Sequence, residues 1–313
     1  SMPSVYVGEN KSVGYTKMYG ATEFKFDFDT NTTTASSLID STVYTQGSTS
    51  NPSYAWYVGG QPGPAVSNSQ KITYATDTSA DNPSSRVAVA RHTMGAISGQ
   101  SHSYLMGGGG TPTGYVSTTS KLTHSNDTTV DLPGSHLASV RYMISTGHGG
   151  GAHAYMFRGM PGTGPNAHTK TERITFANDT TSTLPSSSNM VTTLDKVPYW
   201  GCGNLQCTTH CYYAGGATPT GGASITSTFQ KLTFSNETWA VSPSYMTIPY
   251  RQVTGLTANS SKGYVAGGWN TPAYKVDYIT FADDTWATEP SMTLPSSLPG
   301  STNAWGGSSA TCL

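Results

Sequence analysis

The amino-acid sequence predicts an all-β fold built from small repeated sheets, and three observations carry this prediction. A run of aromatic or apolar residues that ends in Gly-Gly, or in a close variant, recurs roughly every 50 residues. Each run is followed by a short segment in which polar and apolar residues alternate, which is the period of a strand with one buried face. Each alternating segment then enters a turn rich in Asn, Asp and Thr. Asn and Asp tolerate the left-handed backbone of a tight hairpin.

The Gly-Gly runs are expected to form the second strand of each sheet, counted outward from a central axis. These runs lie at 57–60, 105–108, 156–159, 213–216 and 265–268, with a degenerate first copy at 6–9. The alternating segments are expected to form the third strands. They lie at 71–74, 121–124, 173–176, 231–234 and 278–281, with 25–28 in the first repeat.

The remaining two strands of each repeat follow from turn and breaker residues. The outermost strand often ends in Leu-Pro, as at Leu132-Pro133, and Pro marks an edge strand because it cannot donate to a ladder. The chain then returns to the axis, where small residues suit a crowded position; in the third repeat we expect this innermost strand at 87–97. Four strands in each period are typical of a propeller blade.

Six periods therefore predict one domain, a six-bladed β-propeller with four-stranded antiparallel blades. The predicted blades are 301–313 plus 5–36, then 37–83, 84–133, 134–185, 186–243 and 244–300. The chain starts in phase with a second strand at 5–7 and ends in phase with an innermost strand at 304–307. We expect the C-terminal strand to join the N-terminal blade and close the ring, which would hide edges that invite pairing with other chains.

The repeat resembles the kelch repeat. The Gly-Gly doublet is followed by an aromatic residue and then by a Trp, and Phe234 with Trp239 and Phe281 with Trp286 fit the pattern best. The Asn-Asp-Thr turn is similar to the kelch-like repeats of marine bacteriophage and cyanophage tail-fibre proteins. This resemblance implies a virion or extracellular protein that binds host-surface glycan or protein, or other virion proteins. A propeller hosts many functions, so the resemblance is stronger for the fold.

Composition narrows the classes of partner. Only 11% of residues are charged and the net charge is -1, which argues against binding to nucleic acid or to anionic membranes through bulk electrostatics. No stretch reaches the roughly 18 apolar residues that span a bilayer. Residues 1–4 show no signal peptide.

Four basic residues recur in or near the expected innermost strands: Arg91, Arg141, Lys196 and Arg251. One interpretation is a partial ring of cations at the channel mouth that binds an anionic sugar or a carboxylate, to which Arg gives two-pronged contacts. The other interpretation is structural, with each side chain bonded to carbonyl groups of the next blade. The structural interpretation is favoured, since a residue placed by a repeat usually serves the repeat.

The connections between second and third strands differ most from blade to blade, and they are expected to crowd one face. Trp269 and Asn270 begin one of these loops. Variable loops on a rigid scaffold are typical of a recognition surface. The alternative is plain Pro/Gly turn chemistry with Trp269 packed on a neighbour. Recurring histidines, His102, His153 and His210, are expected in solvent-exposed loops.

One cysteine-rich segment has the ligand types of a closed zinc site: Cys202, Cys207, His210 and Cys211. Free cysteines, or disulfides such as Cys202 with Cys207 or Cys211 with Cys312, are favoured over metal. No cofactor is expected, and neither phosphate loops nor hydrolase motifs are found. The predicted function is a non-enzymatic recognition module. The alternatives are a structural protein–protein adaptor and a kelch-like copper oxidase or glycan-active enzyme, which would need an axial Tyr, His and Cys set or paired carboxylates.

Overall fold

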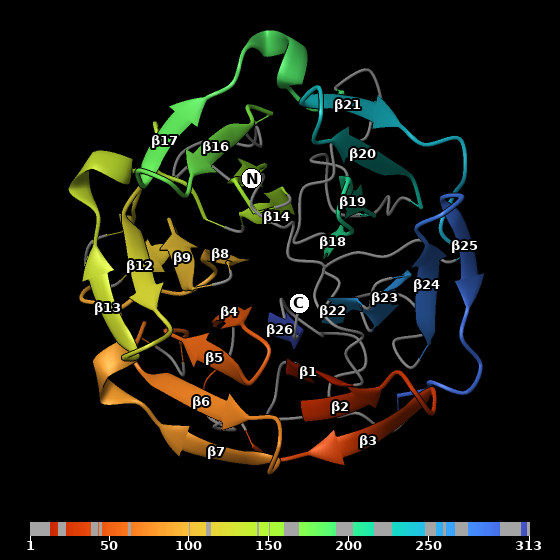
Figure 1. The fold of residues 1–313 in the computed structure, drawn as a ribbon, viewed down its shortest axis with the longest axis horizontal. Coiled ribbons are helices and arrows are strands. Elements are labelled where there is room, and N and C mark those ends of the chain that lie inside the picture. The colour runs from red at the N-terminus through yellow and green to blue at the C-terminus, as the bar shows by residue number, and fades with distance from the viewer. Residues whose placement is uncertain are drawn as a thin grey trace, which may run out of the picture.

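The computed structural model describes residues 13–17, 23–38, 43, 46–61, 64–99, 101–110, 114–142, 144–149, 151–159, 169–191, 203–215, 227–247, 255–258, 261–266, 275–294 and 308–311. It confirms the all-β fold. Six small antiparallel sheets stand in a ring and form a six-bladed β-propeller (Figure 1).

Each blade has four strands, named from the innermost strand outward. Blade 1 is β26 (Ser308–Thr311), β1 (Val13–Lys17), β2 (Glu23–Asp27) and β3 (Thr32–Ser36); blade 2 is β4 (Gly47–Ser50), β5 (Tyr54–Val58), β6 (Ser69–Thr73) and β7 (Thr78–Asp81); blade 3 is β8 (Gly95–Ser98), β9 (His102–Met106), β12 (Thr119–Thr123) and β13 (Thr128–Asp131). Blade 4 is β14 (Ser145–Gly149), β15 (His153–Phe157), β16 (Glu172–Thr175) and β17 (Thr180–Thr183); blade 5 is β18 (Gly203–Gln206), β19 (His210–Ala214), β20 (Phe229–Thr233) and β21 (Thr238–Val241); blade 6 is β22 (Gly255–Ala258), β23 (Lys262–Ala266), β24 (Val276–Thr280) and β25 (Thr285–Thr288).

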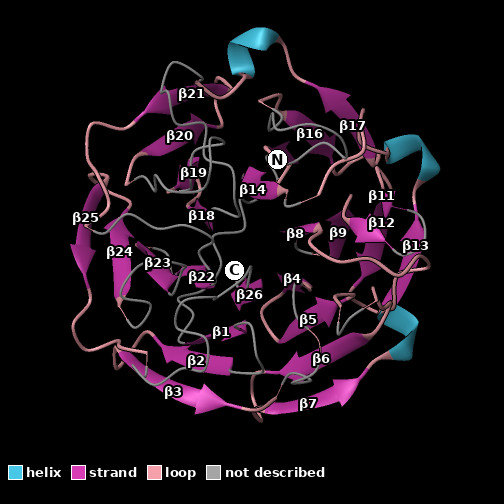
Figure 2. Cartoon of the chain, turned by 180° about the vertical axis from the view of Figure 1, so that it is seen from behind, coloured by secondary structure: helices cyan, strands magenta, loops and turns pink. Residues whose placement is uncertain are grey.

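A few short elements complete the described chain. Blade 3 carries an extra two-stranded ribbon between β9 and β12, formed by β10 (Gly109–Gly110) and β11 (Gly114–Tyr115) (Figure 2). Three 3-10 turns follow the outermost strands of blades 2, 3 and 4: η1 (Pro83–Ser85), η2 (Pro133–Ser135) and η3 (Ser186–Ser188).

The burial of the strands explains their sequences. In β5, β9, β15, β19 and β23 the last four residues are all buried, because each of these strands lies between two neighbouring blades. The third strands alternate instead, so that Ile72 of β6 and Leu122 of β12 are fully buried while their neighbours are partly exposed. The innermost strands lie side by side around the axis in the order β26, β4, β8, β14, β18, β22 and back to β26.

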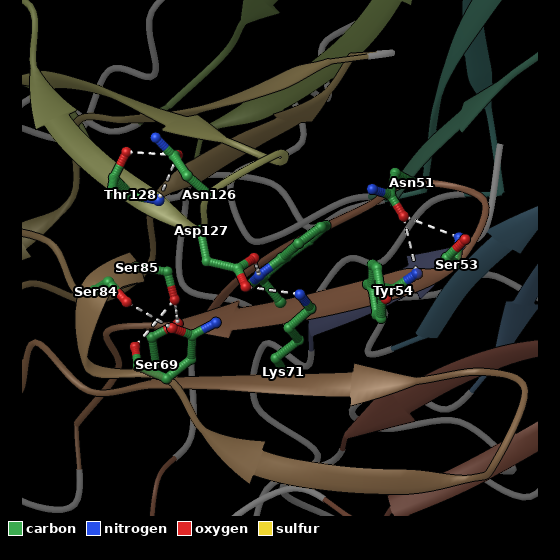
Figure 3. A network of polar contacts seen from close by, with 12 residues as sticks. Asn51, Ser53, Tyr54, Ser69, Lys71, Ser84, Ser85, Asn126, Asp127 and Thr128 are labelled. Carbon is green, nitrogen blue, oxygen red and sulfur yellow. Dashed lines mark hydrogen bonds and ion pairs between the residues drawn. The ribbon is translucent and has the colours of Figure 1, made fainter.

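The hairpins between third and outermost strands have the predicted turn chemistry. Each places one non-glycine residue in the left-handed region, with φ from 50° to 59°: Asn31, Asp77, Asp127, Asp179, Glu237 and Asp284. In blade 3, Asn126 Oδ1 accepts hydrogen bonds from both the amide and the hydroxyl group of Thr128 (Figure 3). Such side-chain bonds replace backbone ladder bonds at the tip of the turn.

Two strand predictions were wrong in position. The innermost strand of blade 3 is confined to Gly95–Ser98, and Arg91 lies before it in the connection from the preceding blade. The second strand of blade 1 is Val13–Lys17, and the predicted segment 5–7 lies outside the described residues. Blade 1 lacks a clear Gly-Gly doublet, so the repeat could not fix its phase. Tyr15 is the residue that matches the buried aromatic positions of the other second strands.

The C-terminal strand joins the first sheet as its innermost strand. β26 pairs antiparallel with β1, and the register sets Gly14 opposite Thr311 and Lys17 opposite Ser308. The predicted segment 304–307 lies outside the described residues, so the observed partner of the tail is the strand around Tyr15.

Candidate functional site

A repeated polar site joins neighbouring blades. Each site contains an acidic residue of a hairpin turn, for which the sequence predicted only a role in forming the turn. At five junctions the acid in the left-handed hairpin position accepts hydrogen bonds from two side chains of the preceding blade. One donor is an aromatic residue of the second strand, and the other is a cation of the third strand. The sets are Tyr15 and Lys25 on Asp77, Trp56 and Lys71 on Asp127, Tyr104 and Lys121 on Asp179, Tyr155 and Arg173 on Glu237, and Tyr212 and Lys231 on Asp284. We call these groups the junction triads.

The geometry of the triads is tight. Lys71 Nζ lies 2.7 Å from Asp127 Oδ2, while Trp56 Nε1 donates to Oδ1 at 3.0 Å; Figure 3 shows Asp127 reaching toward Lys71 across the blade boundary. Partial burial raises the pKa of Asp179, but hydrogen bonds from Lys121 and Tyr104 outweigh it and bring that pKa below its ordinary value. Burial and the bond to Asp179 raise the pKa of Tyr104, so its hydroxyl group stays protonated and donates.

A stack of aromatic rings accompanies each triad and also occurs at the sixth junction. A ring of each second strand packs on a ring that follows the third strand of the next blade. The pairs are Tyr15 with Tyr74, Trp56 with His124, Tyr104 with Phe176, Tyr155 with Phe234, Tyr212 with Phe281, and Tyr264 with Phe28, at centroid distances of 4.8 to 5.9 Å. These contacts bury the side of each blade that a single sheet cannot cover.

The triads predict a pH-dependent share of stability. Replacing Asp179 by Asn keeps a residue that tolerates the left-handed backbone but removes the charge that binds Lys121. We expect the free energy of unfolding at neutral pH to fall by about 1 kcal/mol, a value limited by partial exposure of the pair. Urea denaturation measures the loss.

The contribution of Asp179 to the free energy of unfolding should depend on pH. The lowered pKa of folded Asp179 means that its contribution is present above its unfolded pKa of about 4 and is lost as pH falls through the folded value. The gap between wild type and D179N should therefore shrink below about pH 4. Asp81→Asn is the control, because its pair with Arg86 is exposed. A gap that stays constant with pH would contradict this role.

The predicted cation Arg91 is fully buried. Its Nη1 donates to the carbonyl groups of Gly107 and Thr118, and its Nη2 donates to the carbonyl of Leu105 and to Ser120 Oγ. These partners belong to its own blade rather than to the next one. Burial lowers the pKa of Arg91 to about 10, so the group remains charged at neutral pH.

The main chain of Arg91 binds the preceding blade, so this residue ties two blades together. Its amide donates to the carbonyl of Val66 and its carbonyl accepts from Gly60, both in the loop after β5. Arg141 repeats the pattern with the carbonyl of Val116 and the amide of Gly108.

Arg141 adds a buried ion pair. Its Nη2 lies 2.5 Å from Glu172 Oε2, and both side chains are 1% exposed. Glu172 Oε1 also accepts the amide of Ala138 at 2.7 Å. The burial of Arg91 and Arg141 favours the structural interpretation of the predicted ring of cations. Lys196 and Arg251, the other two predicted members, lie outside the described residues.

The three recurring histidines were expected in exposed loops, and that expectation is wrong. His102, His153 and His210 each begin a second strand and are partly buried. Burial lowers the pKa of all three, and a cation of the adjacent third strand lowers it further. They sit in separate blades.

The side chains of Cys207, His210 and Cys211, the described members of the cysteine-rich segment, do not meet at one point. Cys207 and Cys211 carry free thiols, so neither of the two proposed disulfides is formed. Cys211 lies in the core beside Gly147 of blade 4, where burial raises its thiol pKa, whereas His210 bonds Thr209 at the surface. Consecutive strand residues face opposite sides, which explains the separation. No group of three or more His, Cys, Asp or Glu side chains in the described ranges could hold a metal ion, and Cys202 lies outside them.

Strand direction gathers the predicted recognition loops on one face. Because equivalent strands of the six blades run the same way, each second strand ends and each third strand begins at the same face of the ring, where the outermost strands also end and the innermost strands begin. We call this the loop face. Trp269 and Asn270 fall in such a connection but lie outside the described residues. Two tyrosines that the sequence analysis did not single out, Tyr115 and Tyr142, stack on this face.

Comparison with known proteins gives no assignment. The chain matches no protein-family model, and no curated protein matches it. Within the described ranges there is no helix of the length and apolarity needed to span a membrane.

Proposed function

We propose that this propeller is a non-enzymatic recognition module, a virion tail-fibre or receptor-binding component that binds a glycan or protein on a host cell surface. The observation that carries the proposal is the contrast between scaffold and loops. The same kind of aromatic stack joins all six pairs of neighbouring blades, and a triad joins five of them. The second-to-third connections differ in length and sequence; they lie at 59–68, 107–118, 158–171, 215–228 and 267–275. Variable loops on a rigid scaffold suit recognition.

The charge distribution supports a neutral ligand surface. The charged side chains of the triads and the Arg141–Glu172 pair are engaged within or between blades. The second-to-third connections consist mainly of Gly, Thr, Pro, Ala and Ser, and their only charged residues are Arg158, Lys170 and Lys275. Arg158 is buried. Most of the polar groups in these connections are therefore uncharged hydroxyl and amide groups. Such a surface fits sugar hydroxyls better than phosphates.

Two finer features of the fold belong to the same proposal. The blades are of the kelch-like type found in phage tail fibres, as the Phe234 with Trp239 and Phe281 with Trp286 spacing supports. The pairing of β26 with β1 closes the ring, since it puts the chain end inside the first blade. A virion or extracellular location follows from this type.

Binding of the labelled protein to a glycan array and to intact marine bacterial and cyanobacterial cells tests the proposal. We expect saturable binding to at least one glycan or cell strain, well above that of an unrelated six-bladed propeller. The absence of binding in both assays would overturn the recognition function. Co-purification with virion proteins, without glycan or cell binding, would establish the adaptor function instead.

A further inference from the structure

Two stacked tyrosines stand on the loop face at the boundary between blades 3 and 4. The ring of Tyr115, at the end of β11, lies on the ring of Tyr142 with centroids 4.1 Å apart and planes inclined by 9°. Tyr142 is partly buried, and Tyr115 is 36% exposed, which makes it one of the few large apolar side chains of the described ranges that face solvent. Tyr115 is thus the more exposed of the two rings, and part of it is open to solvent.

The main chain holds the two rings in place. The carbonyl of Val116, the residue after Tyr115, accepts a hydrogen bond from the amide of Arg141, the residue before Tyr142. The amide of Val116 donates to the carbonyl of Gly108. The side chain of Arg141 is anchored by its buried ion pair with Glu172. Because the residues flanking both rings are bonded to each other, the stack is preorganised and little conformational entropy remains to be lost on binding.

A polar group lies beside the stack. A Cβ atom on Gly109 would be 2.8 Å from His92 Nε2 and 3.5 Å from Tyr115 Cδ1, so the imidazole and the tyrosine ring flank this glycine. His92 Nδ1 bonds the hydroxyl group of Thr93, and Nε2 has no hydrogen-bond partner in the part of the chain that the structure describes. Burial lowers the pKa of His92, so it is neutral at neutral pH.

We propose that Tyr115, stacked on Tyr142 and flanked by His92, is a binding platform for an uncharged pyranose unit of a glycan. This inference rests on the proposed recognition function and gives it a site. The C–H face of a pyranose carries small positive charges that match the negative face of an aromatic ring, while the phenolic oxygen and the imidazole nitrogen can bond ring hydroxyls. Rigid tyrosines supply contact area at low entropic cost.

The test is saturation-transfer NMR and calorimetry with the methyl glycosides of glucose, galactose, mannose and N-acetylglucosamine, and with any glycan that the array identifies. For at least one of them, Tyr115→Ala should weaken binding by about tenfold or more, because the stacking surface is removed. Tyr115→Phe keeps the ring and should retain most of the affinity. Tyr245→Ala is the matched control, since Tyr245 is 59% exposed and has no ring partner within the described ranges.

The outcomes separate this inference from the function on which it rests. Glycan binding that Y115A leaves intact, in a variant with wild-type unfolding behaviour, overturns the platform and leaves the recognition function standing. Glycan binding that is lost in Y115A and kept in Y115F and Y245A supports the platform. A wild-type protein that binds cells but none of the glycans overturns the saccharide class, and one that binds neither overturns both proposals.

Discussion

Replacing Arg141 by Met is expected to lower the free energy of unfolding by about 3–5 kcal/mol, because it leaves the carboxylate of Glu172 buried without its counter-charge. Glu172 is 1% exposed, and its partners among the described residues are the amide of Ala138 and the guanidinium group of Arg141. Denaturant unfolding at neutral pH measures the loss. Met keeps an apolar stem where the aliphatic part of Arg packs, so the loss comes mainly from removing the guanidinium group.

The double variant R141M/E172Q isolates the cause. Gln keeps an acceptor for Ala138 and removes the stranded charge, so the double variant should recover much of the stability that R141M loses. Arg86→Met is the matched control, since Arg86 pairs with Asp81 at the surface and should change stability by less than about 1 kcal/mol. If R141M were as mild as R86M, the buried pair would not stabilise the blade.

Periodicity predicted the architecture because each blade needs the same strands. The Gly-Gly runs marked the second strands of blades 2 to 6, and the Asn-Asp-Thr segments marked the hairpins. In blade 1 the Gly-Gly doublet is degenerate, so the repeat predicts the second strand at 5–7, whereas the structure has it at Val13–Lys17. The sequence also could not predict which groups accept hydrogen bonds from the Arg91 side chain. Most of them are backbone carbonyl groups, and their positions depend on how the chain enters the blade.

The junction triads are visible in the sequence as a cation in the third strand and an acid in the next hairpin. The acid is also a typical turn residue, so its second role was missed. Five third strands carry a cation at the same position, and each faces an acid in the next hairpin. The remaining third strand has Tyr278 at that position, and the hairpin it faces has Asn31 in place of the acid. The charge and its partner are therefore absent together, which is what a contact between successive blades requires. The Tyr115–Tyr142 stack left no such signal, since among the described residues such a pair occurs at a single blade boundary.

The junction between blades 6 and 1 is consequently held by other means. Tyr264 stacks on Phe28 at 5.0 Å, within an apolar cluster that joins Phe24 and Phe26 to Val276 and Met292. The ion pair of the other junctions cannot form between Tyr278 and Asn31. β26 lies at this boundary, where it pairs with β1 and also contacts β22 and β4. Packing therefore holds this junction, and under the proposed closure β26 holds it as well.

Deleting residues 308–313 should therefore destabilise the propeller by roughly 3–5 kcal/mol, because about four backbone hydrogen bonds with β1 are lost together with the contacts to β22 and β4. The exposed edge of β1 should also promote association between chains. Denaturant unfolding and light scattering measure the two effects. Deleting 312–313 alone is the control, since it leaves all of β26.

Adding the missing strand back as a separate peptide shows whether the destabilisation comes from losing β26 itself or from shortening the chain. A synthetic peptide of residues 304–313, with Cys312 replaced by Ser, should bind the truncated protein and raise its unfolding midpoint, because the edge of β1 offers the register that sets Gly14 opposite Thr311. A peptide with Ala310→Pro should fail, since Pro cannot donate to the ladder opposite Tyr15. Unchanged stability after truncation would mean that the ring does not depend on its C-terminal strand, and the proposed closure would be abandoned.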